Sequence, residues 1–218
     1  MRLSLITYDV PMGRWEPNAR ERLERAALAL FVERGYDATT VAELAARAGL
    51  TKSTFFRHFA DKREVLFGGQ DMLTERLTTA IAAMPATATT IDCLDAALAA
   101  MAVAFTAERR DLAPQRRAVI AANSELRERE LLKRARLAAA MADALLARGA
   151  DEVSAGLAAE VGVLAFGTAY TRWAAPDNER PFSEIARAVL RDLQVRASTL
   201  GGGAAQSPGA QSPANVQA

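Results

Sequence analysis

The chain has 218 residues, half of them apolar, and its 27 basic and 26 acidic side chains leave a formal net charge of +1. It is rich in alanine and poor in β-branched runs and aromatic residues. This composition favours an all-helical protein with one small and one larger domain. The single cysteine, Cys93, excludes a disulfide framework or a cysteine-built zinc site within one chain, which is typical of a reducing cytoplasm.

Residues 1–17 predict a flexible N-terminal segment. Their short apolar run is interrupted by Asp9 and Pro11, so it is too short for a signal peptide or a membrane span. Met12 is an alternative start to Met1, and the intact mass of the natural protein would decide between them.

The next segment predicts a helix that ends at Gly35, because its apolar residues recur with the helical period. We expect this helix to cover two shorter ones and so complete a three-helix domain. Its inward stripe consists of Leu23, Ala26, Ala27, Leu30 and Phe31.

Two short helices with a tight turn are predicted between Thr40 and Lys62. Thr40 and Glu43 form the capping-box pattern at the start of the first helix, and Gly49 is placed to take a left-handed turn at its end. Thr51 can cap the second helix, whose Phe55 and Phe59 share one face and should be buried. This layout is typical of a helix-turn-helix, whose second helix enters the DNA major groove.

The charge of this segment supports groove binding locally. From Arg47 to Arg63 there are five basic side chains and one acidic one, a local charge of +4. Phosphate neutralisation supplies much of the affinity for DNA, so a basic patch on a near-neutral chain indicates where nucleic acid binds. An ordinary solvated helical hairpin is the alternative on charge alone. The caps, the turn glycine and the hydroxyl-plus-basic composition favour DNA.

The remainder predicts further helices separated by proline, glycine and charged breaks. Asp61 and Glu64 resemble a second capping box, which would open a long helix from Lys62 to about Met84. Residues 200–218 are rich in Gly, Ser, Pro and Gln and predict a disordered tail. The other expected helices span about 90–107, 114–122, 125–148, 151–173 and 183–199.

Motifs within about Asn18 to Phe67 resemble the N-terminal domain of the TetR family of bacterial transcriptional repressors. The resemblance implies a DNA-binding domain over 18–67, with the helix-turn-helix at about 41–60. It also implies a C-terminal regulatory and dimerisation domain over 68–199. The motifs that carry it are Glu33–Tyr36, Ala38–Thr40, Ala48–Lys52, Phe56–Phe59 and Asp61–Glu64.

The resemblance also implies which residues contact DNA. Thr40 and Lys62 would bind phosphates at two helix N-termini. Position 56 is commonly tyrosine in this family, so Phe56 loses a phosphate hydrogen bond but can still pack against a sugar or a thymine methyl. The residues expected at the start or on the groove side of the recognition helix are Thr51, Lys52, Ser53, Thr54, Arg57 and His58.

Dimerisation is implied through helices at about 151–173 and 183–199, which would form a four-helix interface with their two-fold mates. A central core helix is the alternative for the first of these, because its small and apolar residues extend all the way round. A sensor for an unknown small-molecule effector is expected inside residues 90–173. The candidate lining residues, each of which has ordinary core or surface as its alternative, are Met101, Phe105, Ile120, Met141, Phe166 and Tyr170, with Arg117 and Asn123 as polar handles.

An enzyme is disfavoured, because the sequence has no glycine-rich phosphate loop, no metal-spaced His/Cys cluster and no nucleophile elbow; no cofactor or metal is expected. The sequence therefore predicts a cytoplasmic, sequence-specific transcriptional regulator that binds double-stranded DNA and no membrane. A repressor released by a ligand is expected, while activation stays open. The competing interpretation is a ligand-independent architectural or partner-binding helical protein.

Overall fold

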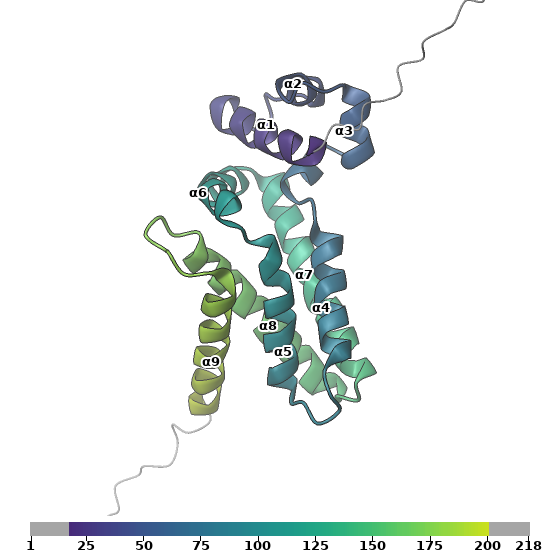
Figure 1. The fold of residues 1–218 in the computed structure, drawn as a ribbon, viewed down its shortest axis with the longest axis vertical. Helices are drawn as coiled ribbons and strands as arrows, with labels where there is room; N and C mark the ends of the chain where they lie inside the picture. Colours follow the sequence, from purple (N-terminus) through teal and green to yellow (C-terminus); the bar gives the residue numbers. More distant parts are fainter. Residues whose placement is uncertain (1–17, 201–218) are drawn as a thin grey trace, which may run out of the picture. The chain divides into compact units, whose positions relative to one another are not determined.

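The computed structural model describes residues 18–200, and within that range the secondary structure is entirely helical, with nine α-helices and two 3-10 turns (Figure 1). The predicted all-helical class is confirmed. The predicted flexible segment at 1–17 and nearly all of the tail lie outside the described residues. The chain divides into two compact units: within the described range, the smaller contains 18–68 and 118–126, and the larger contains 69–117 and 127–200.

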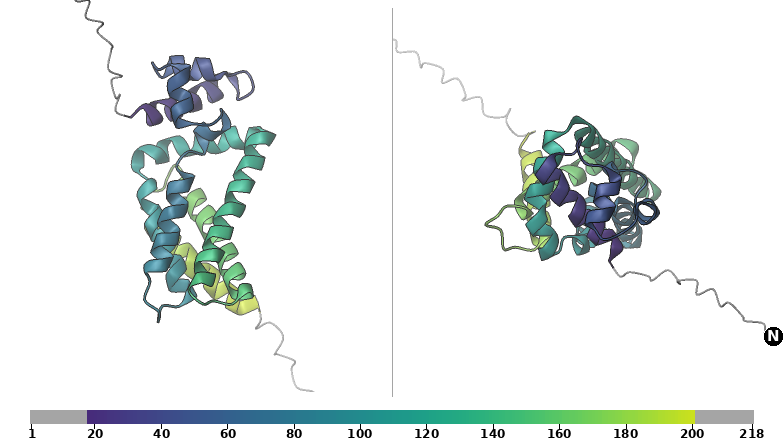
Figure 2. Two further views of the ribbon diagram at one scale, coloured as in Figure 1. Left: turned by 90° about the vertical axis from the view of Figure 1, so that its right-hand side faces the viewer. Right: turned by 90° about the horizontal axis from the view of Figure 1, so that it is seen from above.

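The smaller unit is built on α1 (Ala19–Arg34), α2 (Val41–Arg47) and α3 (Lys52–His58). Figure 2 shows these helices, coloured purple to blue, as one cluster. They bury a shared apolar core, as the helical periodicity of α1 predicts. The core side chains that are almost fully buried include Leu23, Ala27, Leu30, Phe31, Leu44, Phe55 and Phe59.

The predicted caps of α2 and α3 are present. The Thr40 hydroxyl accepts a hydrogen bond from the Glu43 amide at 3.3 Å, and the Glu43 carboxylate accepts one from the Thr40 amide at 2.8 Å. The Thr51 hydroxyl accepts from the Thr54 amide at 3.1 Å. Each cap satisfies amide groups that a helix start leaves without partners, so these side chains determine where both helices begin.

The predicted long helix from Lys62 is wrong. Asp61 does act as a cap, since its Oδ1 accepts from the amides of Arg63 and Glu64 at 2.8 and 3.0 Å, but it opens only the 3-10 turn Arg63–Leu66. Gly69 then takes a left-handed φ of 89°, and α4 begins at Gln70 and ends at Ala83. A left-handed residue cannot continue a right-handed helix, so the glycine pair at 68–69 breaks it.

The helix boundaries around residues 102–114 also differ from expectation. The helix expected over 90–107 ends early: α5 spans Thr90–Met101, and a 3-10 turn follows at Ala102–Ala104. The next helix, α6, then runs over Ala107–Ala122 with Pro114 inside it rather than at its start. Proline removes one backbone hydrogen bond from a helix interior, and here the rest of the helix tolerates that loss.

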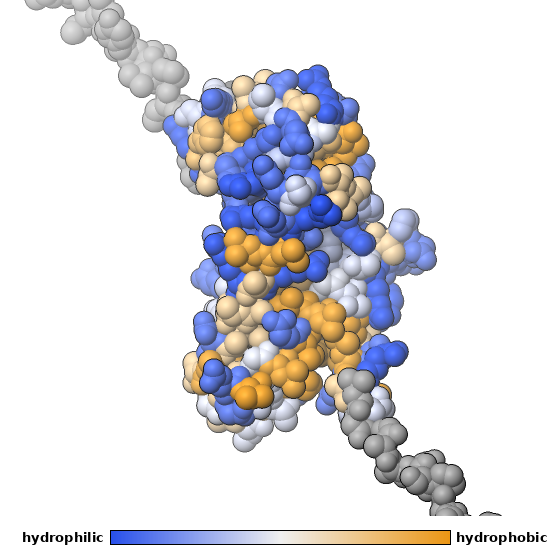
Figure 3. Space-filling view, turned by 180° about the vertical axis from the view of Figure 1, so that it is seen from behind, coloured by the Kyte–Doolittle hydropathy of each residue, from blue (hydrophilic) through white to orange (hydrophobic). Residues whose placement is uncertain are grey.

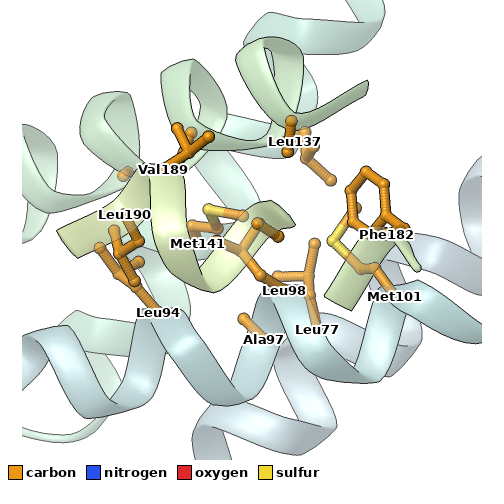
Figure 4. Packing of buried hydrophobic residues seen from close by; sticks show 14 of the residues in the cluster. Leu77, Leu94, Ala97, Leu98, Met101, Leu137, Met141, Phe182, Val189 and Leu190 are labelled. Atoms are coloured by element: carbon orange, nitrogen blue, oxygen red, sulfur yellow. The ribbon is translucent and has the colours of Figure 1, made fainter. Parts of the chain in front are cut away.

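The larger unit packs α4 and α5 with α7 (Ser124–Ala147), α8 (Glu152–Trp173) and α9 (Phe182–Leu200). Figure 4 shows side chains of α4, α5 and α9 gathered around Met141 of α7, which is fully buried. The contact is close at Gly162 of α8, where an added Cβ would lie 2.7 Å from the Met141 sulfur. Glycine at this position therefore leaves room for the Met141 side chain.

Candidate nucleic-acid interface

The recognition helix α3 is held by two aromatic side chains on its inner face. Phe55 and Phe59 are 0% and 3% exposed, and their ring centroids lie 5.4 Å apart. Their burial turns the opposite face of this short helix outward, because residues at i and i+4 share a side. The predicted contact residues on that face are exposed or, for Thr54, half-buried: Thr51, Lys52, Ser53, Thr54, Phe56, Arg57 and His58.

Phe56 presents its ring to solvent, with 49% of its surface exposed. It packs edge to face on Phe55, and the Lys52 ammonium lies 5.9 Å from its ring centroid. An exposed ring beside a cation can lie against sugars or thymine methyl groups while the cation faces phosphate. The position of Phe56 is thus compatible with the contact expected from the sequence.

The positive charge of the segment is concentrated on α3. Arg47 is paired with Glu33, whose carboxylate accepts hydrogen bonds of 3.0 and 2.6 Å, and Arg63 is paired with Asp61 at 3.1 and 2.7 Å. Among the described residues, Lys52 and Arg57 have no hydrogen-bond or ion-pair partner. Two unpaired cations on one helix are therefore available to phosphates or bases.

The turn between α2 and α3 is braced by a side chain that the sequence analysis missed. Arg22 of α1 donates a hydrogen bond of 2.5 Å to the Ala48 carbonyl. Gly49 follows with the predicted left-handed φ, 67°. No local sequence signal identifies Arg22, because the bond joins positions 26 residues apart.

Lys62 is expected from the sequence to contact a phosphate, but its ammonium is directed to the protein itself. Its ammonium donates to the carbonyl oxygens of Tyr36 and Thr39, at 2.8 and 2.9 Å, and lies 4.0 Å from the centroid of the Tyr36 ring. The residue also precedes a 3-10 turn rather than an α-helix. The structure therefore directs the charge of Lys62 inward, to the loop between α1 and α2.

The loop between α1 and α2 is also contacted by the segment 118–126, which belongs to the smaller unit. Asn123 Nδ2 lies 3.3 and 3.4 Å from the carboxylate oxygens of Asp37, and Asn123 Oδ1 accepts from the Leu126 amide at 3.2 Å. Ile120 is 3% exposed in the same unit. Asn123 and Ile120, both expected in the sensor, thus lie in the smaller unit, which a linear assignment of 68–199 to one domain could not show.

Tyr36 is nearly buried in this arrangement. Burial, reinforced by the negative charges of Glu125 and Asp61, raises the pKa of its phenol to about 12. The neutral phenol is therefore the form that the fold accommodates. Its ring also packs edge to face on Phe31, with centroids 5.1 Å apart.

Three of the predicted effector-binding residues do come together in the larger unit. The Phe105 ring lies 5.7 Å from that of Phe166 and 6.0 Å from that of Tyr170, centroid to centroid. Two further members of this aromatic cluster, Trp173 and Phe182, were not predicted from the sequence; Phe182 is stacked on Phe105 at 4.0 Å. The remaining candidates are elsewhere or differently placed: Met101 and Met141 are fully buried, and Arg117 is exposed.

The outer face of α8 is apolar. Val153, Leu157 and Leu164 are 80%, 66% and 55% exposed and share one side of the helix. Figure 3 shows a broad apolar area on the larger unit. Within the described range, α8 is also the single helix that is by itself long and apolar enough to cross a bilayer, and a bent pair formed by α5 with its 3-10 turn and α6 meets the same criterion.

Comparison with known proteins identifies the smaller unit. Residues 24–67 match the model described as bacterial regulatory proteins, tetR family. The chain is 36% identical over 89 residues to the HTH-type transcriptional regulator TcmR of Streptomyces glaucescens, a match that covers 36% of this chain and 39% of TcmR. It is 39% identical over 46 residues to the transposon Tn10 TetC protein of Escherichia coli, covering 21% of this chain and 23% of that protein.

These matches span less than half the length of the curated relatives. Solved structures extend the likeness of the fold over most of the chain. A TetR-family regulator from Syntrophomonas wolfei aligns with a TM-score of 0.56 at 16% identity, over 83% of this chain and 95% of that one. The fatty acid degradation regulator FadR of Bacillus halodurans aligns with a TM-score of 0.54 at 17% identity, over 79% and 96%. At these identities, the likeness concerns the fold alone.

Proposed function

We propose that this chain, whose residues 24–67 match the tetR family of bacterial regulatory proteins, is a regulator of that family rather than an enzyme, and that it binds a specific operator and regulates transcription. The observation that carries the proposal is the outward face of α3, opposite two buried phenylalanines. Among the described residues, its Lys52 and Arg57 have no hydrogen-bond or ion-pair partner. A helix so anchored can enter the major groove as a rigid element. The proposed contact residues are Thr40, Thr51, Lys52, Ser53, Thr54, Phe56, Arg57 and His58.

Arg57 is proposed to read a base, because a guanidinium can donate two hydrogen bonds to guanine. Lys52 is proposed to contact phosphate as a point charge beside Phe56. Arg57→Ala should then lower affinity for the operator more than for random duplex, whereas Lys52→Met should lower both equally.

The test is a fluorescence-anisotropy titration of the full chain with the DNA upstream of its own and the adjacent gene, with random duplex as competitor. Salt-dependent preference for one short palindrome supports a sequence-specific regulator. Equal affinity for random DNA would favour the architectural alternative, and equal loss on both duplexes for Arg57→Ala would remove its base-reading role.

We propose a homodimer through α8 and α9. The exposed Val153, Leu157 and Leu164 of α8, with Val195 of α9 at 62% exposed, form apolar surface that a second copy can cover. A dimer also supplies the two recognition helices that a palindromic operator requires. Cover by a second copy is an alternative to a membrane for α8, whose outward side also carries the exposed, charged Glu160. A cytoplasmic location follows from this proposal.

We propose a repressor whose operator complex is released by a small molecule bound at the aromatic cluster of the larger unit. Phe105, Phe166 and Tyr170 are only partly buried against the core, so their rings can contact a ligand. The ligand would act by favouring a conformation with a lower affinity for the operator. Release of labelled operator by planar aromatic compounds, abolished by Phe166→Ala, tests this; retention of release in Phe166→Ala would place the effector elsewhere.

A further inference from the structure

The Lys62 ammonium makes its hydrogen bonds and its ring contact to the loop between α1 and α2. The two carbonyl oxygens lie at 2.8 and 2.9 Å, and the Tyr36 ring covers a third side at 4.0 Å. Of the three N–H donors of the ammonium, two bind these carbonyl oxygens, and the ring lies close to the charge. The ammonium thus has partners within the protein before any DNA is present.

The loop depends on side-chain donors for its shape. Thr39 is 1% exposed, and its hydroxyl donates to the Gly35 carbonyl at 2.8 Å. The Tyr36 carbonyl accepts from the Thr39 amide at 3.2 Å as well as from Lys62. Gly35 itself has a left-handed φ of 85°. Lys62 therefore completes a short network in a loop that has no regular secondary structure of its own.

The loop leads directly into the DNA-binding elements. Thr39 precedes Thr40, which caps α2. A displacement of the Thr39 carbonyl would shift Thr40, and with it the start of the helix on which α3 is packed. Lys62 is thus linked to the position of α3 through its two hydrogen bonds to the loop and through α2.

We propose that Lys62 is a positioning residue that sets the α1–α2 loop for operator binding and that it does not neutralise a DNA phosphate. The inference rests on the proposed DNA-binding function. The neighbouring Arg63 supports it independently, because Arg63 is paired with Asp61 and so this corner of the smaller unit presents no unpaired cation at 62–63.

The salt dependence of binding separates the two roles. Each phosphate neutralised contributes about 0.9 to the slope of log K against log salt concentration. We expect Lys62→Met to weaken operator binding about tenfold, since two charged hydrogen bonds are lost, and to leave the slope unchanged. Lys52→Met is the matched control with the same chemical change, and its slope should fall by about 0.9.

A charge-preserving variant adds a second criterion. Arginine binds phosphate at least as well as lysine, but its planar guanidinium does not reproduce an ammonium seated between two carbonyls and a ring. Lys62→Arg should therefore also weaken operator binding, at unchanged slope. A slope that falls by about 0.9 in Lys62→Met, or a Lys62→Arg variant that binds like the wild type, would overturn the proposal.

Amide hydrogen exchange of the DNA-free chain keeps the test independent of operator binding. Lys62→Met should speed exchange in residues 36–44, whereas Lys52→Met should not. Unchanged exchange there would overturn the positioning role. A wild-type chain that binds no duplex would instead overturn the proposed function.

Discussion

Arg22 on α1 occupies the space that a side chain at Gly49, in the turn of the helix-turn-helix, would need. Arg22 Nη2 donates to the Ala48 carbonyl at 2.5 Å, and a Cβ on residue 49 would lie 2.8 Å from the same nitrogen. The turn accepts Arg22 because residue 49 has no side chain. Its φ of 67° adds a second reason for glycine, since other residues are strained there.

Gly49→Ala should therefore lower the stability of the smaller unit by about 1–2 kcal/mol for the left-handed conformation, plus the loss of the Arg22 bond. Gly149→Ala is the matched control. Gly149 ends α7 with the same pair of backbone hydrogen bonds and a left-handed φ of 92°, but nothing lies within 4 Å of the place where a Cβ would be added. Urea unfolding followed by circular dichroism measures both. Equal losses in the two variants would show that Arg22 contributes nothing.

Local signals in the sequence predict the helix-turn-helix well. The capping box of Thr40 and Glu43, the cap at Thr51 and the left-handed turn at Gly49 are determined by neighbouring residues, and all three are present. The burial of Phe55 and Phe59 follows from their spacing on one helix face.

Contacts between distant positions cannot be predicted in this way. The Asn123–Asp37 contact joins residues 86 positions apart, and the Lys62 contacts span 26 and 23 positions. The sequence suggests a phosphate contact for Lys62 because it shows a charge at a helix start but not the carbonyls that face it. The glycines at 68–69 are visible in the sequence, yet the apolar periodicity on either side of them indicates one continuous helix.

Gly162 should be intolerant of a methyl group. Alanine there would bring its Cβ to 2.7 Å from the Met141 sulfur and 3.1 Å from Leu94 Cδ2, inside a packed core. Overpacking of this kind typically costs about 1–3 kcal/mol. Gly156→Ala is the control on the same helix: nothing in the chain lies within 4 Å of its Cβ position, so we expect it to gain about 0.5–1 kcal/mol of helix propensity. Thermal unfolding should rank the two variants on opposite sides of the wild type, and a neutral Gly162→Ala would contradict the packing described.

Tyr36 predicts a specific loss of stability at alkaline pH. Its pKa is raised from 10.0 to about 12, so the folded chain binds the phenolic proton more tightly than the unfolded chain. The stabilisation is complete below pH 10, and it is lost as the pH rises from about 10 to about 12. The loss amounts to about 2–3 kcal/mol, at about 1.36 kcal/mol per unit. Urea unfolding of the wild type and Tyr36→Phe across this window measures it. A slope that persists in Tyr36→Phe would assign the effect to other groups.

Leu157→Glu should separate the proposed dimer into monomers. Leu157 is 66% exposed in the single chain, and a glutamate at a covered position would place a second carboxylate near Glu160 in apolar surroundings. In a two-fold dimer the change occurs twice, so the loss of about 1.5–3 kcal/mol for each leucine doubles.

Sedimentation equilibrium gives the association state of the Leu157→Glu variant. Val32→Glu on α1, where valine is 54% exposed, is the control for adding a charge at an exposed apolar site. If Leu157→Glu stays dimeric while its α8 remains helical, the dimer uses another face. A monomeric variant that also loses its preference for the palindrome would link α8 to operator recognition, because a single α3 reads too few bases to retain it.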